Sequence, residues 1–176
     1  MITMATKKTS MFTLTERLTI SAAGTDTFAT IDLGSYVDVG DRQALQVHSV
    51  DFIFQGTTAN ADVVSDLGNG NEALVQVTDL NRGGLVFADD RALVASANFA
   101  ADSSGGRDMA ADLYPDNYGK GSDDGRFVVN DQLYITGQCT GLIGPVNCTV
   151  RVNASIVRLT SVDFMAIAIQ STAADN

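Results

Sequence analysis

Apolar and polar residues alternate along much of the chain, which is the pattern of β-strands that bury one face. The longest alternating run extends from Gln43 to Gln55. On one side of this expected strand lie His48, Val50, Phe52 and Phe54. Because aromatic residues favour strands and bury large apolar areas, we expect the side with the phenylalanines to face the interior.

Shorter runs of the same kind recur, separated by turn residues such as Gly, Asn and Asp. The expected strands cover residues 12–20, 28–39, 43–55, 73–78, 126–136, 146–159 and 161–170. Residues 85–99 fit either a strand or a short helix capped by Asp89, while 56–71 and 101–125 have the composition of loops. About eight short strands with little helix predict an all-β protein, either an antiparallel β-sandwich or a barrel.

The last of these segments, residues 161–170, is apolar on both sides when it is drawn as a strand. Val162 and Phe164 would face one way, and Met165, Ile167 and Ile169 the other. A strand of this kind needs a cover on both sides. We expect the facing sheet of the sandwich to provide one cover, and a second copy of the protein or a neighbouring layer to provide the other. Phe164 and Ile167 are the residues of this segment that we expect to pack inward. The segment therefore predicts a subunit of an assembly.

The charge and composition of the chain indicate an acidic exterior. The chain has 176 residues and a net charge of −10, with 21 acidic and 11 basic residues. Only two of the acidic residues are glutamates, and an excess of Asp is typical of a protein with many turns or of one adapted to a saline medium. Such a surface argues against strong nucleic-acid binding by the folded domain. The sequence contains no apolar run long enough for a transmembrane segment, and its start lacks the pattern of a signal peptide.

Candidate catalytic and disulfide residues are few. His48 is the one histidine, and no nucleophile or orienting carboxylate is evident beside it, so we expect a packed residue and no enzyme. Cys139 and Cys148 flank a turn-rich connection and could face each other across a hairpin, where a disulfide is geometrically allowed. Reduced thiols are the alternative in a chain without an export signal.

The loop of residues 101–125 carries the oxygen-rich and aromatic candidates. Asp116, Asp123 and Asp124 are weak candidates for Ca²⁺ ligands, since the spacing of an EF-hand is absent, and solvated turn residues are the simpler interpretation. We therefore predict no catalytic metal and no cofactor. Tyr114 and Tyr118 in the same loop fit either a contact between subunits or a sugar-binding surface.

Taken together, a polar N-terminal arm, about eight strands, long loops, an apolar closing segment and no recognisable catalytic group resemble the single jelly-roll capsid proteins of icosahedral viruses. Residues 16–54 are also similar to structural proteins of marine viruses. The resemblance implies two antiparallel four-stranded sheets, with a flexible arm over residues 1–11 and one jelly-roll domain over residues 12–176. It also implies a virion protein that assembles with itself into trimers or pentamers of a shell and contacts other virion proteins. The chain departs from many capsid proteins in lacking a strongly basic arm.

Three regions are the expected contacts between subunits: the end of the arm, the loop of residues 101–125 and one face of the last segment. The interface residues predicted there are Met11, Phe12, Tyr114, Tyr118, Met165 and Ile169. Two alternatives are a β-sandwich carbohydrate-binding module that uses the tyrosines of the loop, and a trimeric surface or decoration protein of a virus. An enzyme is the weakest alternative.

Overall fold

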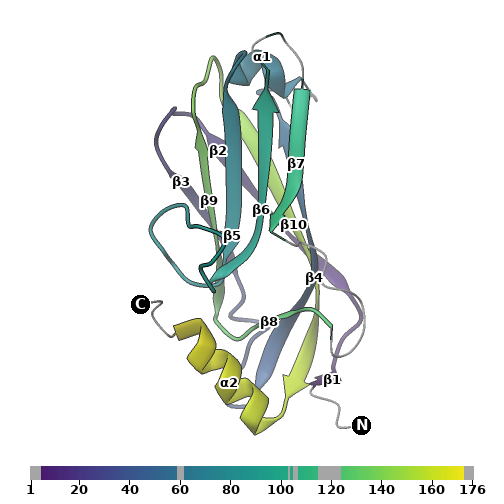
Figure 1. Ribbon diagram of the computed structural model, residues 1–176. Coiled ribbons are helices and arrows are strands. Elements are labelled where there is room, and N and C mark those ends of the chain that lie inside the picture. Colours follow the sequence, from purple (N-terminus) through teal and green to yellow (C-terminus); the bar gives the residue numbers. More distant parts are fainter. Residues whose placement is uncertain (1–4, 59–61, 103, 105–106, 115–123, 173–176) are drawn as a thin grey trace.

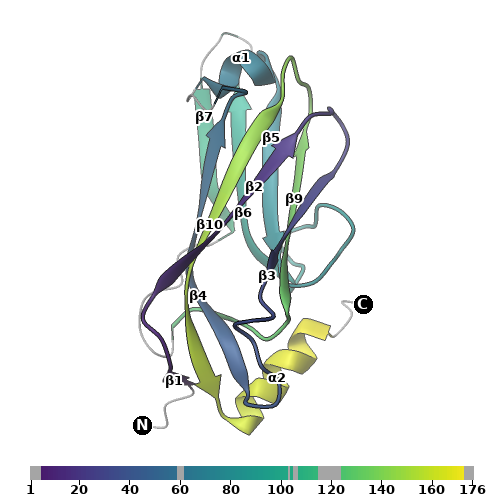
Figure 2. The same ribbon diagram turned by 180° about the vertical axis from the view of Figure 1, so that it is seen from behind.

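The computed structural model describes residues 5–58, 62–102, 104, 107–114 and 124–172, and it folds them into two facing antiparallel sheets (Figures 1 and 2). The first sheet contains β1 (Ala5–Lys7), β2 (Phe12–Ile20), β4 (Gln43–Gln55), β8 (Arg126–Val128) and β10 (Val146–Leu159). The second contains β3 (Thr27–Asp32), β5 (Glu72–Thr78), β6 (Leu93–Ala101), β7 (Arg107–Tyr114) and β9 (Gln132–Cys139). Two helices, α1 (Val63–Leu67) and α2 (Ser161–Thr172), complete the described elements.

The strand pairing is that of a jelly roll. β5 pairs with β6, β4 with β8, β3 with β9 and β2 with β10, so four antiparallel pairs are nested around the β5–β6 connection. The β4–β10 and β5–β9 pairs then join these nested pairs into two sheets. This order confirms the predicted antiparallel jelly-roll sandwich. β7 extends the second sheet beyond β6, and β1 adds to the end of β10 beside β2.

The main core lies between the sheets and contains the residues expected there, including Val50, Phe52 and Phe54. β4 departs from regular alternation, however. Its partner β10 pairs with Ser49 and then with Val47, so His48 is the extra residue of a β-bulge. The bulge turns Leu45 and Val47 into the same core as the phenylalanines, although uninterrupted alternation predicts the opposite side.

The prediction that residues 161–170 form a strand is wrong, because they lie in helix α2. Thr160 caps the start of the helix through reciprocal contacts with Asp163. The Asp163 amide donates to Thr160 Oγ1 at 3.2 Å, and the Thr160 hydroxyl donates back to the Asp163 carboxylate. The Phe164 amide closes the first turn on the Thr160 carbonyl at 3.0 Å. The capped N-terminus and two helix-favouring alanines therefore outweigh the alternation of the apolar side chains.

Two other segments differ from the sequence-based picture. Residues 85–92 form neither strand nor helix, because the Asp90 carboxylate caps the turn by accepting from the Ala92 amide at 2.8 Å, and β6 begins at Leu93. The region expected as a loop over residues 56–71 contains α1. In the expected N-terminal arm, β1 pairs with the end of β10, and the Lys8 amide donates to the Ile156 carbonyl at 2.8 Å.

The expected hairpin between Cys139 and Cys148 is also wrong. Cys139 ends β9 in one sheet and Cys148 lies on β10 in the other, because the connection between β9 and β10 crosses from one sheet to the other. Both cysteines are free and buried in the main core.

Candidate assembly surface

Nine large apolar residues are exposed among the described part of the chain, and three of them gather on α2. The nine are Met11, Phe28, Val39, Ile53, Phe87, Ile143, Val162, Met165 and Ile169. Val162, Met165 and Ile169 are 78%, 59% and 61% exposed, respectively. Their spacing of three and four residues places them along one side of a helix. We call these three residues the outer stripe of α2.

The opposite side of α2 packs on the protein and fixes the position of the helix (Figures 1 and 2). Phe164 is buried, and Ile167 and Ala168 are partly buried beside it. The residues they contact form a second small core at the end of the first sheet: Ala44, Val129, Val157 and Leu159. Phe164 therefore packs inward as predicted, but through a helix, and the outer stripe is the side left to solvent.

The polarity of α2 is unusual for a surface helix. A surface helix normally has one apolar and one charged face. Over the 12 residues of α2, Asp163 is the one charged residue, and no basic residue is present. Both its inner and its outer sides are apolar, which is typical of a helix that is covered all round.

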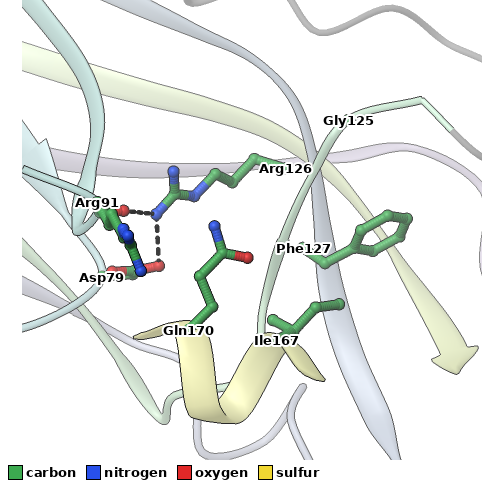
Figure 3. Close-up of a pocket in the computed structure, with 7 residues that line it drawn as sticks. All are labelled: Asp79, Arg91, Gly125, Arg126, Phe127, Ile167 and Gln170. Atoms are coloured by element: carbon green, nitrogen blue, oxygen red, sulfur yellow. Dashed lines mark hydrogen bonds and ion pairs between the residues drawn. The ribbon is translucent and has the colours of Figure 1, made fainter. Parts of the chain in front are cut away.

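A pocket of about 180 Å³ opens beside the second half of α2 (Figure 3). Ile167 and Gln170 of the helix form one wall, and Phe127 of β8 lies next to them. The charged lining residues are Asp79, Arg91 and Arg126. Two arginines against one aspartate give this pocket a net positive charge in a chain whose net charge is −10.

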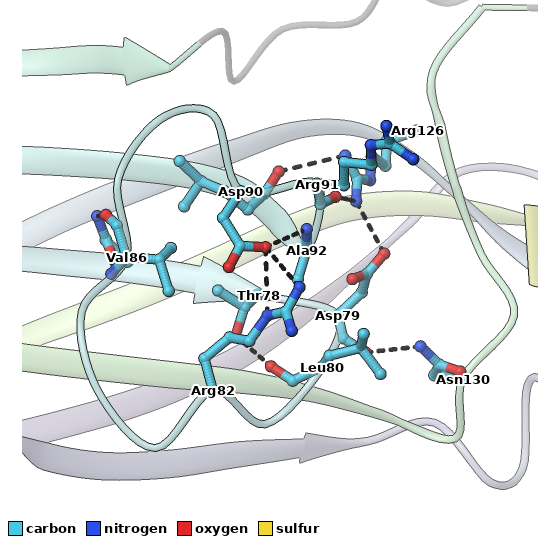
Figure 4. A network of polar contacts seen from close by, with 12 residues as sticks. Thr78, Asp79, Leu80, Arg82, Val86, Asp90, Arg91, Ala92, Arg126 and Asn130 are labelled. Atoms are coloured by element: carbon cyan, nitrogen blue, oxygen red, sulfur yellow. Dashed lines mark hydrogen bonds and ion pairs between the residues drawn. The ribbon is translucent and has the colours of Figure 1, made fainter. Parts of the chain in front are cut away.

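The floor of this pocket is formed by Asp79, which is buried, and Arg126, which is partly buried (Figures 3 and 4). Arg126 Nη2 donates to Asp79 Oδ2 at 2.9 Å and also to the Arg91 carbonyl, while Nη1 donates to the Leu93 carbonyl at 3.2 Å. Asp79 Oδ1 is buried and has no hydrogen-bond partner among the described residues. Burial raises the pKa of the Asp79 carboxyl, and the attraction of the Arg126 charge opposes this rise with a smaller effect.

The connection between β5 and β6 is held beside this floor by a second ion pair (Figure 4). Arg82 Nη2 lies 2.8 Å from Asp90 Oδ1 within the connection. The Asn130 side chain donates to the Asp79 carbonyl at 2.7 Å and ties the connection to the chain after β8. These contacts position Arg91 and Arg126 at the pocket.

Of the four other predicted interface residues, the structure describes Met11 and Phe12 in full. Met11 is exposed between β1 and β2, whereas the ring of Phe12 stacks on Tyr36 of the same chain with the ring centres 5.3 Å apart. Tyr114 is the last residue of β7, and nothing is described of its side chain. Tyr118, Asp116 and Asp123 lie outside the described residues.

Asp124, the remaining candidate Ca²⁺ ligand, is exposed, and its carbonyl accepts a hydrogen bond from the Gln46 side chain. His48 is buried, and its Nε2 lies 2.9 Å from Ser155 Oγ, whose hydroxyl in turn donates to Gln46 Oε1 at 3.2 Å. This chain of contacts links β4 to β10 inside the protein. In the described ranges, no group of three or more His, Cys, Asp or Glu residues could hold a metal ion.

The buried thiols are held in their protonated form. Burial raises the pKa of Cys139 to about 11 and the pKa of Cys148 to about 12. Among the residues that the structure describes, no helix is long and apolar enough to cross a membrane.

Comparisons with known proteins give matches at the level of structure alone. No family model matches the sequence, and no curated protein matches it. Among solved structures, the chain is similar to VP1 of Trichodysplasia spinulosa-associated polyomavirus in complex with 3'-sialyllactose, at 11% identity, covering 92% of this chain and 99% of that chain, with a TM-score of 0.47. It is also similar to the unassembled pentamer of Merkel cell polyomavirus VP1, at 10% identity, covering 90% and 99%, with a TM-score of 0.46. The jelly-roll assignment rests on the strand order described above.

Sequence reasoning identified Met165 and Ile169 as exposed apolar residues but missed their grouping with Val162. It also missed the pocket, because Asp79, Arg91 and Arg126 are far apart in the sequence and meet only when β8 pairs with β4. The capping pattern of Thr160 and Asp163 was the one local signal that would have revealed the helix.

Proposed function

We propose that this protein is a capsid subunit of an icosahedral virus, located in the virion, which assembles through contacts between its own copies. The observation that carries the proposal is the outer stripe of α2: an apolar surface left to solvent on a jelly roll whose core is otherwise complete. Apolar surface of this kind on a folded domain marks a site of protein association.

The jelly-roll order supports the same function, since this fold occurs in many viral shells. The acidic composition supports a subunit whose folded domain does not bind nucleic acid strongly, because phosphate neutralisation needs clustered basic residues. We expect trimers or pentamers as the intermediate and contacts with other virion proteins in the complete particle. Binding of DNA by the isolated subunit that is tight and weakens steeply with salt would contradict this part of the proposal.

The test is the mass distribution of the purified full chain, measured by light scattering and negative-stain microscopy at low and at high salt. Closed particles of uniform size support a shell protein. A stable trimer at every concentration would instead identify a surface or decoration protein. A monomer that binds glycans on an array and never assembles would overturn the proposal in favour of a carbohydrate-binding module.

A further inference from the structure

We propose that the outer stripe of α2 is the surface on which two copies of this chain meet, with their α2 helices antiparallel across a two-fold axis near Met165. This inference rests on the proposed function and specifies which surface forms one of its contacts. Its starting point is the stripe of Val162, Met165 and Ile169, the exposed side of a helix whose inner side is already packed on the body.

The charge distribution favours a second copy over a membrane as the partner of this stripe. A helix that lies on an anionic lipid surface normally carries Lys or Arg on its polar side. α2 contains no basic residue and one acidic residue, Asp163, and the whole chain carries a charge of −10. An anionic membrane would therefore repel this protein and would offer no basic group to Asp163. A second copy also carries −10, but it presents Arg91 and Arg126 beside its own α2.

The pocket beside α2 adds a feature that an acidic partner complements. Arg91, an exposed residue, and Arg126 line the pocket together with Gln170 of the helix. An acidic side chain is the group that such a positive rim attracts, and the chain itself contains 21 acidic residues. A second copy supplies both an apolar stripe and carboxylates.

The arrangement of residues along α2 makes a two-fold contact self-complementary. With the axis near Met165, Val162 of one copy lies opposite Ile169 of the other, so one stripe covers the other over its full length. Asp163, Ile167 and Gln170 follow a spacing of four and three residues and therefore share one flank of the helix. In an antiparallel pair these flanks run along the same side, so Asp163 of each copy lies on the side where the pocket of the other copy opens.

The first experiment introduces one accessible thiol per chain. In the variant Met165→Cys, the new thiols of two copies lie beside the two-fold axis, while Cys139 and Cys148 are buried and do not compete. Oxidised glutathione would oxidise the two new thiols to one disulfide and would itself be reduced to two molecules of glutathione. We expect covalent dimers on a non-reducing gel. The matched control is Ile143→Cys, an apolar position in the connection between β9 and β10 that is even more exposed than Met165, at 78% against 59%, and this variant should remain monomeric on the gel.

The second experiment removes the contact without crosslinking. Met165→Asp places a charge on a side chain that is 59% exposed, so the fold should persist, as circular dichroism would verify. We expect this variant to lose assembly by light scattering while Ile143→Asp keeps it. If wild type and Met165→Asp assemble equally, or if Ile143→Cys crosslinks as well as Met165→Cys, the inference is wrong although the proposed function stands.

Two further outcomes would contradict the contact between copies, and one of them would also contradict the proposed function. If the wild-type protein stays monomeric and the Met165→Cys variant forms no covalent dimers, both the proposed function and the contact are wrong. If the wild-type protein sediments with vesicles of anionic phospholipid and the Met165→Asp variant does not, the outer stripe binds a lipid surface and the choice of a second copy is wrong.

Discussion

At the scale of single residues, Asp79 combines burial with a charged partner. Its Oδ2 accepts from Arg126, its Oδ1 has no hydrogen-bond partner within the described part of the chain, and burial raises its pKa more than Arg126 lowers it. The folded protein therefore holds the Asp79 proton more tightly than the unfolded chain does. By linkage, the contribution of Asp79 makes the free energy of unfolding fall as the pH rises from the unfolded pKa, about 3.9, through the raised folded pKa.

The variant Asp79→Asn removes this dependence. We expect the difference in unfolding free energy between wild type and variant to change across the window that begins near pH 4, with the wild type losing stability relative to Asp79→Asn as the pH rises. Urea denaturation at a series of pH values measures it. Asp89→Asn, an exposed residue of the same connection, is the control and should show no such trend. A relative gain of wild-type stability with rising pH would mean that the attraction of Arg126 outweighs burial.

The two cysteines lead to a second prediction at this scale. Because burial raises their pKa values to about 11 and about 12, neither thiol should react with a thiol reagent in native protein near pH 8, where an ordinary cysteine with a pKa of about 8.5 reacts. Unfolding in denaturant without reductant should release both thiols for reaction. Native protein is one control, and reduced, unfolded protein is the other. Absence of reactive thiols in the unfolded, unreduced chain would show that Cys139 and Cys148 form a disulfide.

At the scale of elements, α2 and β4 show where pattern reasoning succeeds and where it fails. The bounds of β4 agree with the alternating run from Gln43 to Gln55. In a long strand that buries one face, every second side chain points to the core, so the pattern of apolar residues is clear. The bulge at His48 contains no Gly or Pro, so no local residue indicates that the alternation shifts there by one position. In α2, both strand alternation and helical spacing fit the short apolar segment, and the capped N-terminus rather than the apolar residues favours the helix.

The reciprocal contacts between Thr160 and Asp163 give a test of the helix. In Thr160→Ala, the Asp163 amide loses its acceptor, and we expect a loss of about 1 kcal/mol in the free energy of unfolding. Asp163→Asn should cost less alone. The two substitutions together should cost less than the sum of the single effects, because both remove the same reciprocal contact. Strictly additive effects in urea denaturation would show that the two side chains act independently.

At the scale of the whole molecule, the jelly roll could be anticipated from the number of strands, their spacing and the lack of helix, but its strand order could not. Nested pairs such as β2 with β10 join residues that are more than one hundred positions apart. No local pattern encodes those partners. The pocket beside α2 depends on the same long-range pairing, because β8 brings Arg126 to the connection after β5. The sequence therefore predicted only the part of the candidate surface that lies within one segment of the chain, namely Met165 and Ile169.

Net charge and apolar contact act in opposite directions when copies of this chain meet, and salt separates them. Each copy carries −10, so copies repel at low ionic strength. The screening length shortens from about 10 Å at 0.1 M salt to about 3 Å at 1 M, whereas burial of the outer stripe needs no ions. We therefore expect assembly, measured by light scattering at fixed protein concentration, to increase with sodium chloride.

A charge-reduced variant tests the cause of this effect. Replacing the exposed residues Asp89 and Asp131, which lie away from α2 in the sequence, by Asn changes the net charge from −10 to −8 by removing two negative charges. Repulsion falls with the product of the charges, so this variant should assemble at lower salt than the wild type while keeping the same contact. Assembly that dissolves as salt rises would show instead that ion pairs between copies, such as those expected at Arg91, dominate over the apolar stripe.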